Sequence, residues 1–235
     1  MTAVNFIKRI SMSGKREQNK RKNRQAILAA AQQLFIQRGF EKTRIDDLAR
    51  SAGIGKGTVY SYFASKEEIL LELIANMRIK IHQQFSDNND ANAPVTAQLM
   101  TLFMCQFDFV ENNPELARIM LRESMFPDKN TVEQRNQVDI KYLNTVSAIL
   151  YQGQQRGELR GELDLLTCTL QMYSNYLTII SGWFIGYTRD HADVRDCLQR
   201  TILLSLSGCA SEPFAEQYKT NTPHQNFYLN LRCKD

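Results

Sequence analysis

Two short helical patterns joined by a tight glycine turn constrain the fold of this chain more than any other feature. The patterns cover residues 44–52 and 56–63, and Gly53 lies between them. At about 100° per residue, Val59 and Phe63 share one face of the second helix. Two short helices in this order predict a helix-turn-helix, which needs other helices to cover its apolar side.

An amphipathic helix precedes this motif. Over residues 24–38 the apolar side chains recur at i, i+3 and i+4, which places them on one stripe. Gly39 is placed to end that helix, and Thr43 is placed to cap the helix over 44–52. The region is therefore expected to form a three-helix unit.

A capping box starts the next helix and leads into the rest of the chain. Ser65 is expected to cap it, with Glu68 reaching back to the Ser65 amide, and the helix continues to about Phe85. A polar linker over 86–94 follows. Beyond it the pattern predicts helices near 94–112, 114–126, 129–156, 163–188 and 190–208. No sustained alternation of apolar and polar residues predicts a strand, so the expected fold class is all-α.

The charge is divided unevenly along the chain. Up to Lys66 there are 14 Lys and Arg against 4 Asp and Glu, whereas the remainder has 15 against 21. A basic N-terminal module on an acidic body favours a polyanion as partner of the first part alone.

The outer side of the second short helix is suited to DNA. Gly57, Thr58, Tyr60, Ser61 and Tyr62 fan across the side opposite the apolar pair. Their hydrogen-bonding tips match base edges and phosphates in a major groove. Glycine at 57 costs about 0.5–1 kcal/mol of helix stability relative to alanine, which makes sense if DNA must approach closely there.

The run GFEKTRIDDLARSAGIGKGTVYSYFASKEEIL, residues 39–70, resembles the N-terminal signature of the TetR family of repressors. The resemblance extends from Arg24 to about Leu73, with one departure at Gly55, where the family usually has Ser or Thr to cap the recognition helix. It implies phosphate contacts from Thr43, Tyr60 and Lys66, and positions in or beside the groove for Arg44, Lys56, Thr58, Ser61 and Tyr62. It also implies flanking backbone or minor-groove contacts from the basic residues Lys20, Arg21, Lys22 and Arg24.

Other interpretations of these residues stay open at this point. The Tyr-x-Tyr pair can serve surface or core packing, and the basic arm can be a solubilising tail. Lys66 can form an ion pair with Glu41 or Asp47 instead of binding phosphate.

For the second domain the resemblance implies a helical cavity for an inducer and a dimer formed by the last two helices. The sequence is compatible with both, because the helix over 163–188, which is uncharged from residue 165 onward, supplies one apolar face. The last helix supplies an apolar stripe of Leu198, Ile202, Leu206 and Cys209. Several aromatic and methionine side chains can line an adaptable apolar pocket, although such residues are more often plain core. They are Phe103, Phe107, Met120, Met125, Tyr142, Met172, Tyr176 and Trp183.

These patterns divide the chain into four segments. We expect a flexible basic arm over 1–19 and a helix-turn-helix DNA-binding domain over 20–66. A helical ligand-binding and dimerisation domain over 67–210 follows, with the helix over 66–85 linking the two domains. A tail with little structure of its own is expected over 211–235.

An enzyme, a metalloprotein and a membrane protein are all disfavoured. The histidines lack ligand spacing, no nucleophile motif occurs, and the glycine-rich run 53–58 lacks the Gly-Lys-Ser/Thr order of a nucleotide-binding loop. We therefore expect no catalytic residue, metal or cofactor. Residues 165–188 carry no charge, but polar residues through their middle favour a buried helix over a membrane span. The scattered cysteines indicate a reducing cytoplasm.

The expected function is that of a cytoplasmic, homodimeric transcriptional repressor. It would bind palindromic operator DNA and be released by a small apolar or aromatic ligand. The sequence does not separate this function from that of an activator with the same fold, or of a regulator without a small-molecule inducer.

Overall fold

A computed structural model describes residues 3–126 and 132–212, and these residues are predominantly helical. The helices are α1 (Ala3–Arg38), α2 (Ile45–Ala52), α3 (Lys56–Tyr60), α4 (Lys66–Asn88), α5 (Val95–Asn112), α6 (Pro114–Met125), α7 (Val132–Gln155), α8 (Leu165–Phe184) and α9 (His191–Ser207). In the described ranges the β-pairing is a single isolated bridge between Leu159 and Ala210. The predicted all-α fold class is therefore confirmed.

The chain divides into two compact units inside α4. The first unit ends at Met77 and the second begins at Arg78. The division falls within the helix that was expected to link two domains. It does not coincide with the expected domain boundary at residue 66 or with the linker expected over 86–94. No glycine or proline interrupts residues 66–88, so the helix continues through the division.

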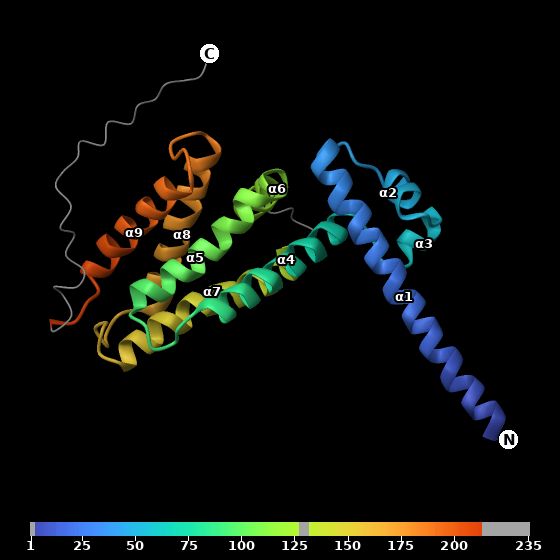
Figure 1. Cartoon of the computed structure of the whole chain (residues 1–235), viewed down its shortest axis with the longest axis horizontal. Helices are drawn as coiled ribbons and strands as arrows, with labels where there is room; N and C mark the ends of the chain where they lie inside the picture. The colour runs from blue at the N-terminus through green and yellow to red at the C-terminus, as the bar shows by residue number, and fades with distance from the viewer. Residues whose placement is uncertain (1–2, 127–131, 213–235) are drawn as a thin grey trace, which may run out of the picture. The chain divides into compact units, whose positions relative to one another are not determined.

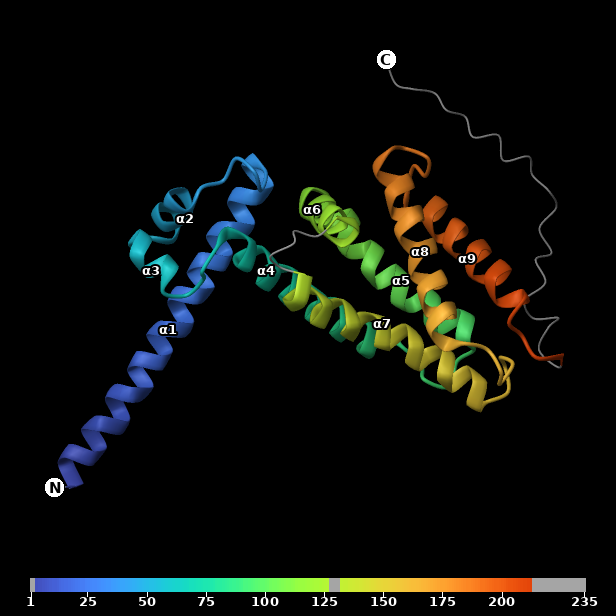
Figure 2. The same ribbon diagram turned by 180° about the vertical axis from the view of Figure 1, so that it is seen from behind.

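In the first unit, α2 and α3 lie on one side of the C-terminal half of α1 (Figures 1 and 2). Glycines end α1 and α2 as expected: Gly39 and Gly53 have φ of 79° and 69°, in the left-handed region. The buried core of this unit includes Ile27, Ala31, Leu34, Phe35, Leu48, Val59, Phe63, Ile69, Leu70, Leu73 and Ile74. The apolar stripes predicted from the sequence therefore face inward.

The predicted cap of α2 is wrong. Arg44, not Thr43, is the N-cap residue, and its amide donates to the Asp47 carboxylate at 3.3 Å. Thr43 is 2% exposed, and its hydroxyl donates to the Gly39 carbonyl at 2.8 Å. A buried hydroxyl needs a partner, and here the preceding turn supplies it.

The capping box of α4 is confirmed in one half. The Glu68 amide donates to the Ser65 hydroxyl at 3.2 Å, as expected. The Glu68 carboxylate, however, accepts from the Ala64 amide and not from that of Ser65.

The N-terminal segment is helical where a flexible arm was expected. α1 begins at Ala3, and its N-terminal half extends past the other helices of the unit (Figure 1). Residues 15–24 contain neither glycine nor proline and are rich in Lys, Arg, Glu and Gln. Such residues favour the continuation of a helix whose C-terminal half is already packed.

In the second unit, α5 packs against α7 and α9, and α8 packs against both of them. Figures 1 and 2 show these four helices side by side. The predicted tail over 211–235 lies, beyond Glu212, outside the described residues.

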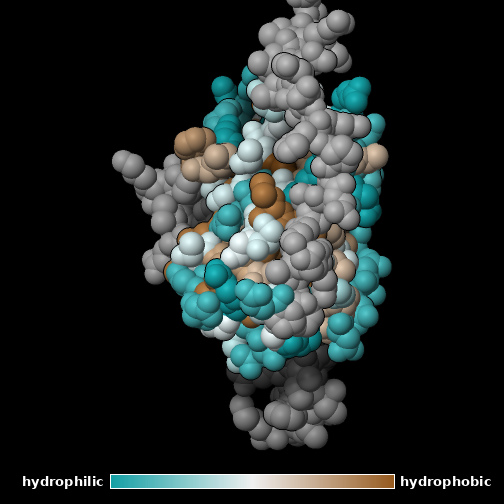
Figure 3. Space-filling view, turned by 90° about the vertical axis from the view of Figure 1, so that its left-hand side faces the viewer, coloured by the Kyte–Doolittle hydropathy of each residue, from teal (hydrophilic) through white to brown (hydrophobic). Residues whose placement is uncertain are grey.

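The apolar stripe predicted to form a dimer interface on α9 belongs instead to the core of its own chain. Leu198, Ile202 and Leu206 are at most 2% exposed, and Cys209 is 9% exposed. The stripe is covered because α5 and α8 both pack on α9. Exposed leucines lie elsewhere, at Leu204 on α9 and at Leu166 and Leu170 on α8, which are 71%, 64% and 45% exposed. Figure 3, from the side that carries α9, shows brown apolar side chains emerging among polar ones.

None of the helices in the described ranges is long and apolar enough to cross a membrane. Most of the uncharged segment 165–188 forms α8. Met172, Tyr176 and Ile180 of this helix are buried in the core.

Candidate functional site

The turn between α2 and α3 holds the second short helix in place. The Gly53 amide donates to the Arg50 carbonyl at 3.3 Å, and the Ile54 amide donates to the Ala49 carbonyl at 3.0 Å. α3 begins after Gly55, which has no side chain to cap it. It ends at Tyr60, earlier than the predicted Phe63, and continues as a hydrogen-bonded turn.

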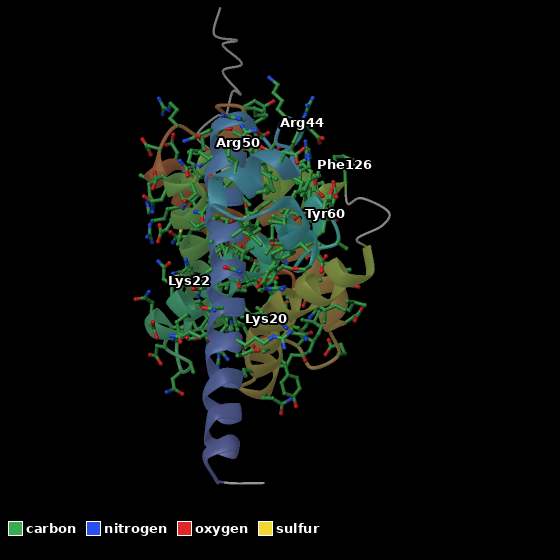
Figure 4. The ribbon with its side chains drawn as sticks, turned by 90° about the vertical axis from the view of Figure 1, so that its right-hand side faces the viewer. Lys20, Lys22, Arg44, Arg50, Tyr60 and Phe126 are labelled. Atoms are coloured by element: carbon green, nitrogen blue, oxygen red, sulfur yellow. The ribbon has the colours of Figure 1, made fainter. Side chains whose placement is uncertain are left out.

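The two sides of α3 differ as the sequence predicts. Val59 and Phe63 are buried, whereas Tyr60 is 49% exposed. Lys56, Gly57 and Ser61 are also exposed, and Thr58 and Tyr62 are half-buried. Figure 4 labels Tyr60 together with Arg44, which is exposed at the start of α2. The outward side chains therefore form a polar surface with aromatic members.

Among the described residues, no contact requires glycine at position 57. A β-carbon added there would meet nothing within 4 Å, and its φ lies outside the left-handed region. The helix stability lost by having glycine here is therefore not explained by contacts with other described residues.

Lys56 forms an ion pair with Asp46 across the helix-turn-helix. Its Nζ lies 2.9 Å from Asp46 Oδ1, and both side chains are about half exposed. The hydrogen bond and charge of Asp46 raise the pKa of Lys56. An exposed pair of this kind contributes little to stability, so it holds the Lys56 ammonium only weakly.

Two residues predicted to bind phosphate are engaged within the chain. Thr43 is buried, and the Lys66 Nζ donates to the Phe40 carbonyl at 2.7 Å. The same ammonium lies 4.2 Å from the centroid of the Phe40 ring and 3.4 Å from the Glu41 carbonyl oxygen. In this conformation both residues stabilise the turn between α1 and α2.

Residues of α1 divide into two groups. Lys20 and Lys22 are exposed along the helix (Figure 4). Arg24 is half-buried and donates to both carboxylate oxygens of Glu72 on α4. Asn23 donates to the Tyr62 hydroxyl at 3.3 Å. Sequence reasoning missed Glu72, Asn23 and Asp46, because their partners lie on other helices.

Most of the predicted ligand-binding residues gather in the core of the second unit. Phe103 stacks on Tyr176 at 5.2 Å between ring centroids, and Phe107 meets Trp183 edge-on at 5.6 Å. The core cluster also includes Met172, with Tyr142 packed against it. Met120 and Met125 on α6 lie outside this cluster, and Met125 is 52% exposed.

Polar groups lie among these aromatic side chains. Burial raises the pKa of both Tyr142 and Tyr176, so both stay neutral phenols. Gln106 is 7% exposed, and the Arg78 guanidinium lies 6.0 Å from the centroid of the Tyr142 ring. A few polar groups among apolar side chains are typical of small-molecule sites. Within residues 3–126 and 132–212, no cluster of His, Cys, Asp or Glu is arranged to hold a metal ion.

Similarity to known proteins identifies the family. Residues 27–73 match the model of the bacterial regulatory proteins of the tetR family. The HTH-type transcriptional repressor KstR2 of Mycobacterium tuberculosis is 32% identical over 151 residues, which cover 63% of this chain and 73% of that repressor. The chain belongs to the TetR family of transcriptional regulators.

Solved structures agree with this TetR-family fold. A tetR family transcription regulator from Shewanella sp. PV-4 is 26% identical, with a TM-score of 0.64 over 80% of this chain and 98% of that chain. The regulator FadR from Bacillus subtilis, solved in complex with stearoyl-CoA, is 23% identical, with a TM-score of 0.67 over 78% of this chain and 98% of that one. The second likeness supports the fold alone. Within the family signature this chain departs at Gly55, which leaves α3 without a side-chain cap.

Proposed function

We propose that this TetR-family regulator is a homodimeric repressor that binds palindromic operator DNA and is released by a small ligand with a large apolar part. The observation that supports the proposed DNA binding is the exposed, polar and aromatic side of α3, opposite the buried Val59 and Phe63. Glycine at 57 supports it, because none of the residues that the structure describes would contact a side chain there.

The proposed DNA contacts come from α1, α2 and α3. Lys22 and Tyr60 would bind phosphates, and Arg44 would lie beside the groove. Lys56, Thr58, Ser61 and Tyr62 would face base edges or the groove wall. Thr43 and Lys66 would act indirectly, because their side chains hold the turn that precedes α2.

The proposed dimer uses the exposed side of α8 and α9. Leu166, Leu170 and Leu204 expose large apolar side chains, which favours burial against a second copy. The Asn175 amide donates to the Ser205 hydroxyl at 3.0 Å, so the two helices present one continuous surface. Leu204→Glu should give a folded monomer in sedimentation at micromolar concentration, with Gln199→Glu, which is exposed on another side of α9, as the control. A monomeric wild type would contradict the dimer.

The proposed ligand site is the aromatic core of the second unit. Phe103, Phe107, Tyr176 and Trp183 would contact the apolar part of the ligand. FadR of Bacillus subtilis was solved with stearoyl-CoA, and the fatty acid metabolism regulator protein of the same organism is 23% identical over 71% of this chain and 86% of that protein. Long-chain acyl-CoA is therefore the first class of compound to test.

Release requires that the ligand favour a conformation that binds DNA poorly. Full switching needs a preference of about 10⁴-fold, or ~5.5 kcal/mol, for that conformation. α4 is the proposed lever, because this one helix contributes to both compact units.

The test begins with DNA sites selected from a random pool by the wild-type protein. The selected site should be palindromic, with half-sites about one helical turn or a small multiple apart. Stearoyl-CoA should then release the protein, whereas free coenzyme A should not. A single asymmetric half-site would contradict the dimeric mode of binding. A reporter fused to the selected site separates repression from activation.

A further inference from the structure

Arg24 has a set of partners that differs from that of an exposed DNA-binding arginine. Its Nε donates to Glu72 Oε1 at 2.7 Å, and its Nη2 donates to Glu72 Oε2. The pair is thus bidentate, which is the strongest common geometry between arginine and a carboxylate. The guanidinium also lies 4.5 Å from the centroid of the Phe63 ring.

The same guanidinium reaches the end of the recognition helix. Arg24 Nη1 donates to the Tyr62 carbonyl at 3.4 Å, and the neighbouring Asn23 donates to the Tyr62 hydroxyl at 3.3 Å. Tyr62 and Phe63 form the turn that follows α3. Two adjacent residues of α1 therefore hold both the backbone and the side chain of this turn, while Glu72 holds Arg24 from α4.

We infer that Arg24 is a positioning residue for DNA binding and not a phosphate contact. It fixes the C-terminal end of α3 to α1 and α4, so that Tyr60 and Tyr62 are presented to DNA in one orientation. The inference rests on the proposed DNA-binding function. It replaces the flanking backbone or minor-groove contact that the family resemblance implies for Arg24, because that contact would require its donors to leave Glu72.

The two roles of Arg24 predict opposite effects of a change at its partner. If Arg24 positions α3, neutralising Glu72 frees the guanidinium and weakens operator binding. If Arg24 binds phosphate, neutralising Glu72 removes a competing carboxylate and leaves binding unchanged or tighter. The isosteric substitution Glu72→Gln therefore separates the two roles.

The affinity experiment uses the full-length protein and a DNA site selected from a random pool. We expect Glu72→Gln and Arg24→Gln each to weaken binding about tenfold, in the range of one lost charge-assisted hydrogen bond. Neither change should alter the slope of log affinity against log salt. Lys22→Gln, at an exposed position on the same helix, is the control and should reduce that slope by about 1.

Double variants sharpen the result. Arg24→Gln with Glu72→Gln should be no worse than either single change, whereas Lys22→Gln with Glu72→Gln should be additive. The charge exchange Arg24→Glu with Glu72→Arg should recover part of the affinity. Helix content by circular dichroism, measured well below the unfolding temperature, establishes that each variant is folded. If Arg24→Gln does not fold, Arg24→Lys keeps the charge without the bidentate geometry and should weaken binding in the same direction.

Hydrogen exchange tests the inference without DNA. The amides of Ser61, Tyr62 and Phe63 donate to carbonyls of α3 and should exchange faster in Glu72→Gln than in the wild type. Unchanged exchange in both Glu72→Gln and Arg24→Gln would overturn the inference. So would wild-type or tighter DNA binding by Glu72→Gln together with a reduced salt slope for Arg24→Gln. If the wild type selects no DNA, the proposed function fails, and the exchange rates still decide whether Arg24 positions the turn.

Discussion

Both α3 and α9 bury apolar side chains, yet the residues that the two helices leave outside differ in kind. Away from the buried Val59, α3 exposes Tyr60 and Lys56, which are suited to a polar partner. On the side of α9 opposite the buried Ile202, Leu204 is exposed. The apolar stripe of a helix thus identifies its inner side, whereas the residues left outside carry the information about partners.

The distribution of apolar residues around each helix explains why the sequence predicts one interface from the wrong residues. In α3 the inner and outer sides are separated by polarity, so the sequence assigns them directly. In α9 apolar residues occur on both sides, and the longer stripe favours the wrong assignment. The core of the chain itself covers that stripe.

The largest expected effect is on the free energy of unfolding, and it distinguishes the inner side of α9 from the outer side. Leu206→Ala should lower the free energy of unfolding by about 2–5 kcal/mol, because it leaves a cavity in a core position that is 0% exposed. Leu204→Glu should leave helix content unchanged and alter the oligomeric state. Urea unfolding followed by circular dichroism measures the loss of stability in Leu206→Ala. A Leu206→Ala variant as stable as the wild type would contradict the assignment of the core.

The next effect concerns the outer side of α3. Thr58→Ala should change the preference among bases by about 1–3 kcal/mol, because the proposed role of Thr58 is to contact base edges. Tyr60→Phe should weaken binding to all sites alike, because its proposed partner is a phosphate. Affinities for a panel of single-base variants of the selected site measure both. The roles are inverted if Tyr60→Phe alone changes base preference.

A smaller effect tests the turn that positions α3. Gly53→Ala should destabilise the protein by about 1–2 kcal/mol, because φ at this position is 69°. Gly161→Ala is the matched control, since its φ is not left-handed and an added β-carbon would meet nothing within 4 Å. Its effect should stay within about 0.5 kcal/mol. Equal thermal stabilities of the two variants would contradict the strain argument.

The smallest effect has opposite signs for stability and binding. Gly57→Ala should stabilise the free protein by about 0.5–1 kcal/mol, since alanine favours a helix and finds open space there. The same change should weaken operator binding, because the proposed approach of DNA leaves no room for the methyl group. Thermal unfolding and anisotropy titration measure the two quantities. A variant that binds DNA as the wild type does would leave this glycine without a functional explanation.

Local signals were enough to predict the helix-turn-helix, the inner residues of α3 and the glycine stops at Gly39 and Gly53. These features depend on residues only a few positions apart, through helical periodicity and the left-handed conformation that favours glycine. The family resemblance lies in the same local run of residues. The extent of α1 was not predicted, because a basic segment without breaks can either follow a packed helix or remain an arm.

The partner of each charged or polar side chain, by contrast, depends on how the helices pack. Arg24 meets Glu72, Lys56 meets Asp46, and Lys66 meets the Phe40 carbonyl. Each of these contacts joins different helices or a helix and a distant turn, so no short pattern in the sequence encodes it. The same reason applies to α9, whose inner side is set by the helices that pack on it. Local conformational preferences are properties of neighbouring residues, whereas burial and pairing are properties of the whole packed unit.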